Sequence, residues 1–164
     1  MLSNAMQDAI NGQIRDELYS AYMYLSMAAY FDSTGLPGFA SWMRAQSEEE
    51  VEHAMKFFDF VAERGGRVEL HAIEKPPIEF ESPRDVFEKT YEHEQKVTGL
   101  IHDLYTLAVD EDDYGTQVML HWFIEEQVEE EDNVSQILDT LERVGEKDQA
   151  LIMLDRELGQ RGSE

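Results

Sequence analysis

The stretch "SEEEVEHAMKFFDF", Ser47–Phe60, decides the fold because it places acidic residues on a helical apolar stripe. Met43, Glu50 and Phe57 follow one another in steps of seven, so on a helix they lie nearly above one another on one face. His53 comes three residues after Glu50 and projects the same way. The sequence therefore predicts a long amphipathic helix that carries a carboxylate and an imidazole into a core.

The same arrangement recurs in three other segments of the chain, each with one glutamate in the middle of an apolar stripe. A single glutamate of this kind can be protonated or can reach solvent. Four at one depth, with no lysine or arginine nearby on the stripes, predict a bound cation, because an unpaired buried carboxylate costs several kcal/mol. The four stripes are Ile10, Glu17 and Tyr24; Met43, Glu50 and Phe57; Phe87, Glu94 and Ile101; and Phe123, Glu130 and Ile137.

The apolar spacing and its interruptions predict four long helices and a short fifth one. "STGLPG", the glycine pair at 65 and 66, and "EDD" at 111–113 separate them, and Ser82 with Asp85 forms a candidate capping box. The expected bounds are about 4–32, 38–64, 83–110, 113–144 and 148–158. Each long helix would be about 40 Å long at about 1.5 Å per residue.

Residues 66–82 form the one long connection, which can span roughly 55 Å at about 3.3 Å per residue. That reach is enough to cross the whole bundle, whereas the other connections between long helices are short. We therefore expect residues 1–164 to form a single all-α domain, an antiparallel four-helix bundle with one long crossover and a short fifth C-terminal helix. Prolines 76 and 77 favour an extended strap in the crossover.

Charge and composition limit which classes of partner and metal site the protein can have. The 164 residues carry a formal net charge of −23, which repels nucleic acid and attracts cations. There is no cysteine, so disulfides, thiolate zinc sites and iron–sulfur clusters are excluded. Neither a basic, apolar leader nor a run of about 18 apolar residues occurs. We expect a cytoplasmic protein with no membrane partner.

The ligand types indicate which cation is bound. Glu50 and His53 offer oxygen and nitrogen, whereas magnesium and calcium prefer oxygen alone. Mixed donors fit Fe(II), Mn(II) or Zn(II), and several carboxylates around a pair of ions fit two iron atoms best. Known di-iron bundles use a Glu from each of two helices and Glu-x-x-His from the other two. Gln127 and Glu130 stand where a second Glu-x-x-His would be, so we expect two unequal metal positions.

The fourth helix also carries the acidic run "EEQVEEED", residues 125–132. We interpret Glu125, Glu131 and Asp132 as a solvated face. Glu126 and Glu129 flank the direction of Gln127 and Glu130, and Glu49 lies beside Glu50, so we expect a third, weaker cation site beside the pair.

"RDELYSAYMYLSMAAYFDSTGLPGFASWMRAQSEEEVEHAMKFFDFVAERGGRV", "YEHE" and "EEQVEEED" together resemble non-haem ferritins of the bacterial and archaeal type over essentially the whole chain. The resemblance implies a ferritin-like bundle and a hollow shell of 24 chains. Such a shell oxidises Fe(II) with oxygen or hydrogen peroxide at a ferroxidase centre with two irons. It stores the ferric product as a mineral.

The resemblance also implies a role for each matching residue. Glu17, Glu50 and His53 match the first iron site, and Glu50 bridges to a second site completed by Glu94 and Glu130. Gln127 matches an amide that orients bound oxygen or water. Tyr24 matches a tyrosine beside the centre with a redox or hydrogen-bonding role, although a plain core tyrosine would have the same spacing. Glu49, Glu126 and Glu129, with Glu130 shared, match the third site.

Other functions share parts of this pattern. A haem-containing bacterioferritin would have a methionine at position 51, where this chain has Val51. A rubrerythrin-like peroxidase would normally have a cysteine-rich iron domain. A di-iron oxidase or peroxidase that stores no iron keeps the same ligands and stays an alternative, whereas a non-catalytic helical protein leaves the four glutamates unexplained. The apolar fifth helix, "QALIMLDREL", predicts either an interface, which the resemblance places at four-fold contacts, or a tail folded onto its own bundle.

Overall fold

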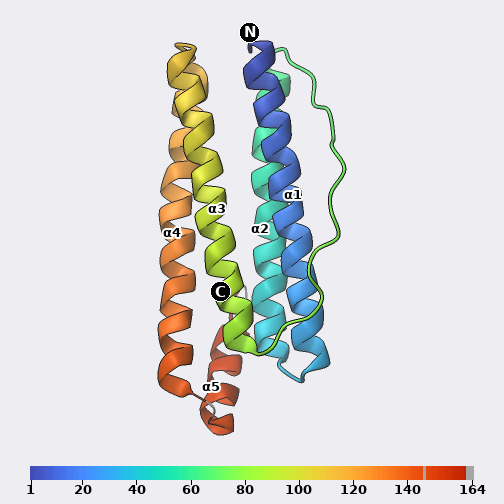
Figure 1. Ribbon diagram of the computed structural model, residues 1–164, viewed down its shortest axis with the longest axis vertical. Coiled ribbons are helices and arrows are strands. Elements are labelled where there is room, and N and C mark those ends of the chain that lie inside the picture. The colour runs from blue at the N-terminus through green and yellow to red at the C-terminus, as the bar shows by residue number, and fades with distance from the viewer. Residues whose placement is uncertain (146, 162–164) are drawn as a thin grey trace.

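Helices form wherever the sequence has apolar residues at helical spacing, and the predicted all-α bundle with one long crossover is confirmed (Figure 1). The structure is a computed structural model and describes residues 1–145 and 147–161. The helices are α1 (Asn4–Ser33), α2 (Pro37–Glu63), α3 (Pro83–Asp110), α4 (Tyr114–Val144) and α5 (Asp148–Leu158). α1 packs mainly against α2, and α3 packs against α4.

Glycine ends α2 as the sequence predicts. Gly65 has φ of 74°, a left-handed conformation that a residue without Cβ adopts readily. Its N–H donates to Ala62 O at 3.0 Å, and the N–H of Gly66 donates to Val61 O at 2.9 Å, which is the Schellman arrangement. The chain therefore leaves the helix sharply and enters the crossover.

The start of α3 differs from the predicted capping box. Ser82 Oγ accepts a hydrogen bond from the N–H of Asp85 at 3.1 Å, as expected. The Asp85 carboxylate, however, accepts from the N–H of Glu81 at 3.0 Å and not from that of Ser82. Aspartate is one methylene shorter than the glutamate usual in this motif, and Lys89 Nζ contacts the same oxygen at 2.8 Å.

The crossover is an extended strap that runs along α1 from one end of the bundle to the other (Figure 1). Near its start, Asn11 Nδ2 donates to Arg67 O at 3.3 Å. Further along, Ser26 Oγ donates to Pro77 O at 2.5 Å, and the Phe80 ring packs against Tyr30 with centroids 5.3 Å apart. Because the strap spans the bundle, α2 and α3 run in the same direction.

α5 folds back onto the end of its own bundle. Leu154 and Leu158 are buried, and the Asp155 carboxylate accepts a hydrogen bond from the N–H of Phe39 at 2.9 Å. This bond caps α2 from another helix, since α2 has no side-chain cap of its own. Ile152 and Met153 on the opposite face stay 50% and 66% exposed. The tail folded onto its own bundle is thus observed, and the interface stays a prediction.

Two apolar clusters fill the bundle, one toward each end. One cluster includes Met27, Phe31, Phe39 and Phe87, and the other includes residues such as Phe57. Buried polar side chains from all four long helices lie between the clusters. The fold therefore encloses a polar layer at mid-height, which is where the four stripe glutamates lie.

Candidate metal centre

The polar layer holds the four glutamates that the heptad spacing picks out. Glu17, Glu50, Glu94 and Glu130 come from α1, α2, α3 and α4 and are 1%, 2%, 1% and 3% exposed. None of the ion pairs found in residues 1–145 and 147–161 joins a lysine or arginine to them. In the described part of the chain, the four carboxylates are thus buried together with no lysine or arginine paired to any of them.

A first group of possible metal ligands consists of Glu17, Glu50 and His53, which each offer one atom within 4.8 Å of the others. His53 Nδ1 lies 3.6 Å from Glu50 Oε2, as expected for residues one helical turn apart. Glu17 Oε2 is buried and has no hydrogen-bond partner among the residues that the structure describes. An unpartnered buried carboxylate oxygen in such a group is what a cation would satisfy.

A second group consists of Glu50, Glu94 and Glu130, again with ligand atoms within 4.8 Å of one another. All three residues are buried. Glu50 belongs to both groups, so its carboxylate lies where it can bridge two ions. The second group contains oxygen donors only, whereas the first contains a nitrogen, and the two positions are therefore chemically unequal.

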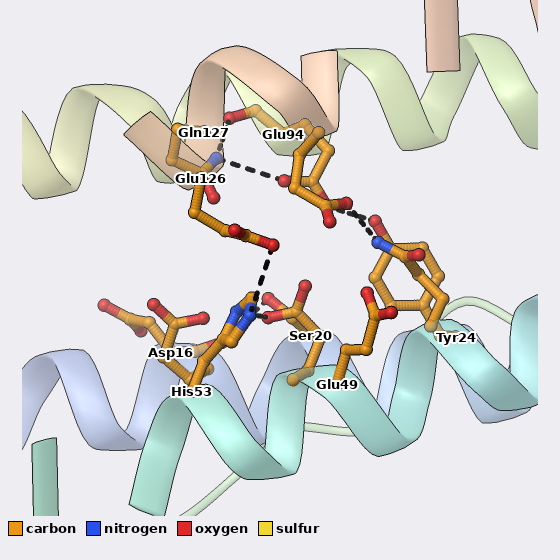
Figure 2. Close-up of polar contacts among 12 residues, drawn as sticks. Asp16, Ser20, Tyr24, Glu49, His53, Glu94, Glu126 and Gln127 are labelled. Carbon is orange, nitrogen blue, oxygen red and sulfur yellow. Dashed lines mark hydrogen bonds and ion pairs between the residues drawn. The ribbon is translucent and has the colours of Figure 1, made fainter. Parts of the chain in front are cut away.

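A third group, Glu49, Glu126 and Glu130, borders a cavity of about 630 Å³ beside the polar layer. Figure 2 shows Glu126 pointing toward His53, whose Nε2 lies 3.9 Å from Glu126 Oε1. Glu129 lines the same cavity but is outside this group, because adjacent residues on a helix point in directions about 100° apart. Glu49 pairs with Arg161 at 3.0 Å.

Neutral donors orient the carboxylates. Gln127 Nε2 donates to Glu94 Oε2 at 3.1 Å, and the Tyr24 hydroxyl donates to Glu94 Oε1 (Figure 2). Tyr24 is completely buried, so this hydrogen bond fixes its hydroxyl inside the layer. Donors of this kind to ligand side chains set the direction in which the ligand oxygens point.

Two further donors, Gln13 and Gln46, are absent from the residues that the sequence pattern selects. Gln13 Nε2 donates to Glu17 Oε1 at 2.9 Å, and Gln46 Nε2 donates to Glu130 Oε2. Both amides are buried. Gln13 lies four residues before Glu17, to which it donates, and that spacing is the signal by which it could have been found. Gln46 precedes Glu50 by the same spacing, but its acceptor, Glu130, lies on another helix.

Burial raises the pKa values of all four glutamates, and the charges of neighbouring carboxylates raise them further. Burial, followed by the Glu50 charge, raises the pKa of Glu17 well above its ordinary value. Burial and Glu94 likewise raise the pKa of Glu50. Burial raises the pKa of Glu94 to about 6, and burial with the Glu94 charge raises that of Glu130 to about 8. Near neutral pH the layer therefore holds both protons and negative charge, and a cation can displace those protons.

Comparisons with known proteins show which proteins this chain resembles. A model of the ferritin-like domain matches residues 7–144. A bacterial non-heme ferritin of Bacteroides fragilis (strain 638R) is 42% identical over 161 residues, which cover 98% of this chain and 100% of the relative. A probable bacterial non-heme ferritin-like protein of Haemophilus influenzae is 38% identical, with 97% of this chain and 96% of the relative covered.

Among solved structures, an open pore ferritin from the hyperthermophilic archaeon Archaeoglobus fulgidus has a TM-score of 0.97 and 53% identity, with 98% of this chain and 99% of that chain covered. No helix in the described part of the chain combines the length and apolar character needed to cross a membrane. The family match and the identity over nearly the full length confirm the resemblance seen in the motifs, and the chain belongs to the ferritin family.

Proposed function

We propose that this chain stores iron and contains a di-iron ferroxidase centre. It oxidises Fe(II) with oxygen or hydrogen peroxide and deposits the ferric product as a mineral inside a hollow shell of 24 copies. The observation that carries the proposal is the sharing of Glu50 between two groups of buried ligands, one of which includes the unpartnered Glu17 Oε2. Family membership supports the same function.

The two groups of ligands suggest which residues hold each iron. Glu17 and His53 hold the first iron, Glu94 and Glu130 hold the second, and Glu50 bridges them. Gln127 orients Glu94 together with bound oxygen or water, and Tyr24 supplies a hydrogen bond beside the centre. Glu49 and Glu126, with Glu130 shared, form a third site that receives iron on its way to the mineral. Glu129 lines the same cavity, and we assign it to this site although it lies outside the group of three. No haem takes part.

The donor set favours oxidation. Anionic oxygen ligands bind Fe(III) more strongly than Fe(II), since the higher charge gains more from each carboxylate, and this lowers the reduction potential of the bound iron. Two Fe(II) ions held together each give up one electron. Dioxygen accepts both electrons and is reduced to the level of peroxide, so no one-electron oxygen radical needs to be released.

Charge and surface are consistent with a shell that collects iron. The net charge of −23 attracts Fe(II) and repels nucleic acid. The exposed side of α5, with Ile152 and Met153, provides an apolar contact surface, which we assign to four-fold contacts between copies. We further propose that residues 1–164 act as one domain and that the protein is cytoplasmic.

Rapid mixing of the assembled protein with two Fe(II) per chain in air tests the centre. Glu50→Ala combined with His53→Ala removes the shared ligand and the only histidine of the described groups, so oxidation should slow at least about a hundredfold. Glu125→Ala serves as a control because Glu125 is exposed and belongs to none of the described groups. Equal rates for the double variant and the wild type would exclude a ferroxidase centre at this position.

A further inference from the structure

Glu130 is the one residue common to the second and third groups of possible ligands among the described residues. Its carboxylate is within reach of Glu50 and Glu94 on one side and of Glu49 and Glu126 on the other. The two oxygens of a carboxylate turn together about one bond. The orientation of Glu130 therefore decides which group it completes, and a donor that fixes this orientation controls how metal divides between the two positions.

Gln46 is placed to supply that control. It lies on α2 and is only 1% exposed. Its side-chain amide donates a hydrogen bond across the polar layer to Oε2 of Glu130, which lies on α4. It precedes Glu50 by one helical turn, so it enters the layer from the same side as the shared ligand. The bond holds one Glu130 oxygen toward α2.

We propose that Gln46 is a positioning residue that fixes the Glu130 carboxylate for the second metal position and limits its turning toward the third group. The inference rests on the proposed metal centre. Gln46 need not touch iron, since it acts through the carboxylate that it orients. Replacing Gln46 by a residue without an amide should shift metal from the second position toward the third.

Gln13 provides a matched comparison within the same chain. Its Nε2 donates to Glu17 Oε1 at 2.9 Å, and the side chain is buried. Glu17 belongs to the first group and not to the two groups that contain Glu130. A general loosening of the polar layer would affect all positions in both variants, whereas positioning predicts that each amide affects only the position of its own carboxylate.

Zn(II), which undergoes no redox change, is the probe. Crystals of the wild type, Gln46→Met and Gln13→Met are soaked in a series of Zn(II) concentrations, and anomalous scattering gives the occupancy of each position. Gln46→Met should weaken Zn(II) binding at the Glu50, Glu94 and Glu130 position about tenfold relative to the first position, and should raise occupancy beside Glu49 and Glu126. Gln13→Met should weaken the first position alone.

If the ratio of Zn(II) occupancy at the second position to that at the third is the same in Gln46→Met as in the wild type, the proposal is overturned. The metal centre itself would remain intact. Wild-type crystals without Zn(II) at any of the three positions would overturn the metal centre as well. If Gln46→Met does not fold, Gln46→Asn goes through the same series, because it keeps the amide but is one methylene too short to hold Glu130 in place. The same redistribution is expected, and its absence again contradicts the positioning role.

Discussion

The Gln127 amide on α4 donates to the Glu94 carboxylate on α3, with Nε2 3.1 Å from Oε2. The same nitrogen also lies 3.2 Å from Glu94 O and 3.2 Å from Thr98 Oγ1. A neutral donor thus occupies the place where symmetric di-iron bundles have the glutamate of their second Glu-x-x-His. It lowers the pKa of Glu94, against the larger effect of burial, and so keeps this carboxylate available to a cation near neutral pH.

Replacing Gln127 by leucine should therefore weaken metal binding at the second position. The lost hydrogen bond to a charged group corresponds to about tenfold in affinity. Calorimetric titration of the apoprotein with Zn(II) at pH 7 measures this affinity. Thr98→Val is the matched control, since it removes another partner of the same amide and leaves the bond to Glu94 in place. Equal losses of affinity in both variants would assign the effect to packing and not to this hydrogen bond.

The protonation of Glu130 predicts how stability depends on pH. Its pKa rises from an ordinary 4.5 to about 8 in the folded apoprotein, so the folded state holds the proton more tightly than the unfolded state does. Below pH 4.5 Glu130 is protonated in both states, and its contribution to the free energy of unfolding is fully present. This contribution is lost as the pH rises from 4.5 through 8, because the unfolded state then releases the proton that the folded state still holds. Glu130→Gln removes this loss.

Chemical denaturation of the apoproteins at pH 5 and pH 8 checks this prediction. The free energy of unfolding of Glu130→Gln, relative to wild type, should rise between the two pH values by a few kcal/mol. The exposed Glu125→Gln variant should show no such change. A wild type that gains as much stability as Glu130→Gln between pH 5 and pH 8 would contradict the raised pKa.

The Arg161 guanidinium lies 3.0 Å from Glu49 and 4.6 Å from the Trp42 ring centroid. It therefore competes with a cation for one ligand of the third group. An exposed ion pair contributes about 0.2–1 kcal/mol, so Arg161→Ala should raise cation affinity there up to about fivefold. In double-mixing experiments, the delay before a second portion of Fe(II) is oxidised at the full rate should shorten. Arg161→Lys keeps the charge and should behave like the wild type; a longer delay in Arg161→Ala would contradict the competition.

The four glutamates and the helices that carry them could be predicted because residues seven apart overlie one another on any helix, whatever surrounds it. Gln13 has a partner within its own helix and could have been found from the same spacing. Gln46 could not, since its acceptor, Glu130, lies on another helix and depends on how α2 and α4 are paired. The Arg161–Glu49 contact depends in the same way on how α5 folds back onto the bundle.

The close approach of α5 to α2 predicts a steric effect at Gly38. A Cβ at this position would lie 1.7 Å from the Asp155 main-chain oxygen, so Gly38→Ala must push α5 away. We expect a loss of about 1–3 kcal/mol and a lower midpoint of thermal unfolding. Gly99→Ala is the control, because Gly99 lies inside α3 and a Cβ there would meet no described atom within 4 Å beyond its chain neighbours and its own turns of helix backbone. Alanine there should stabilise the helix slightly. A neutral Gly38→Ala would show that α5 does not pack closely on α2.

Iron retention tests the proposed storage function most directly. Purified protein receives a large excess of Fe(II) over two ions per chain in air at neutral pH, and size exclusion then records iron and protein in the same fractions. Storage predicts that iron far beyond two per chain elutes with a particle of shell size. A small particle with at most two irons per chain would contradict storage and leave a di-iron oxidase or peroxidase of the same fold as the function.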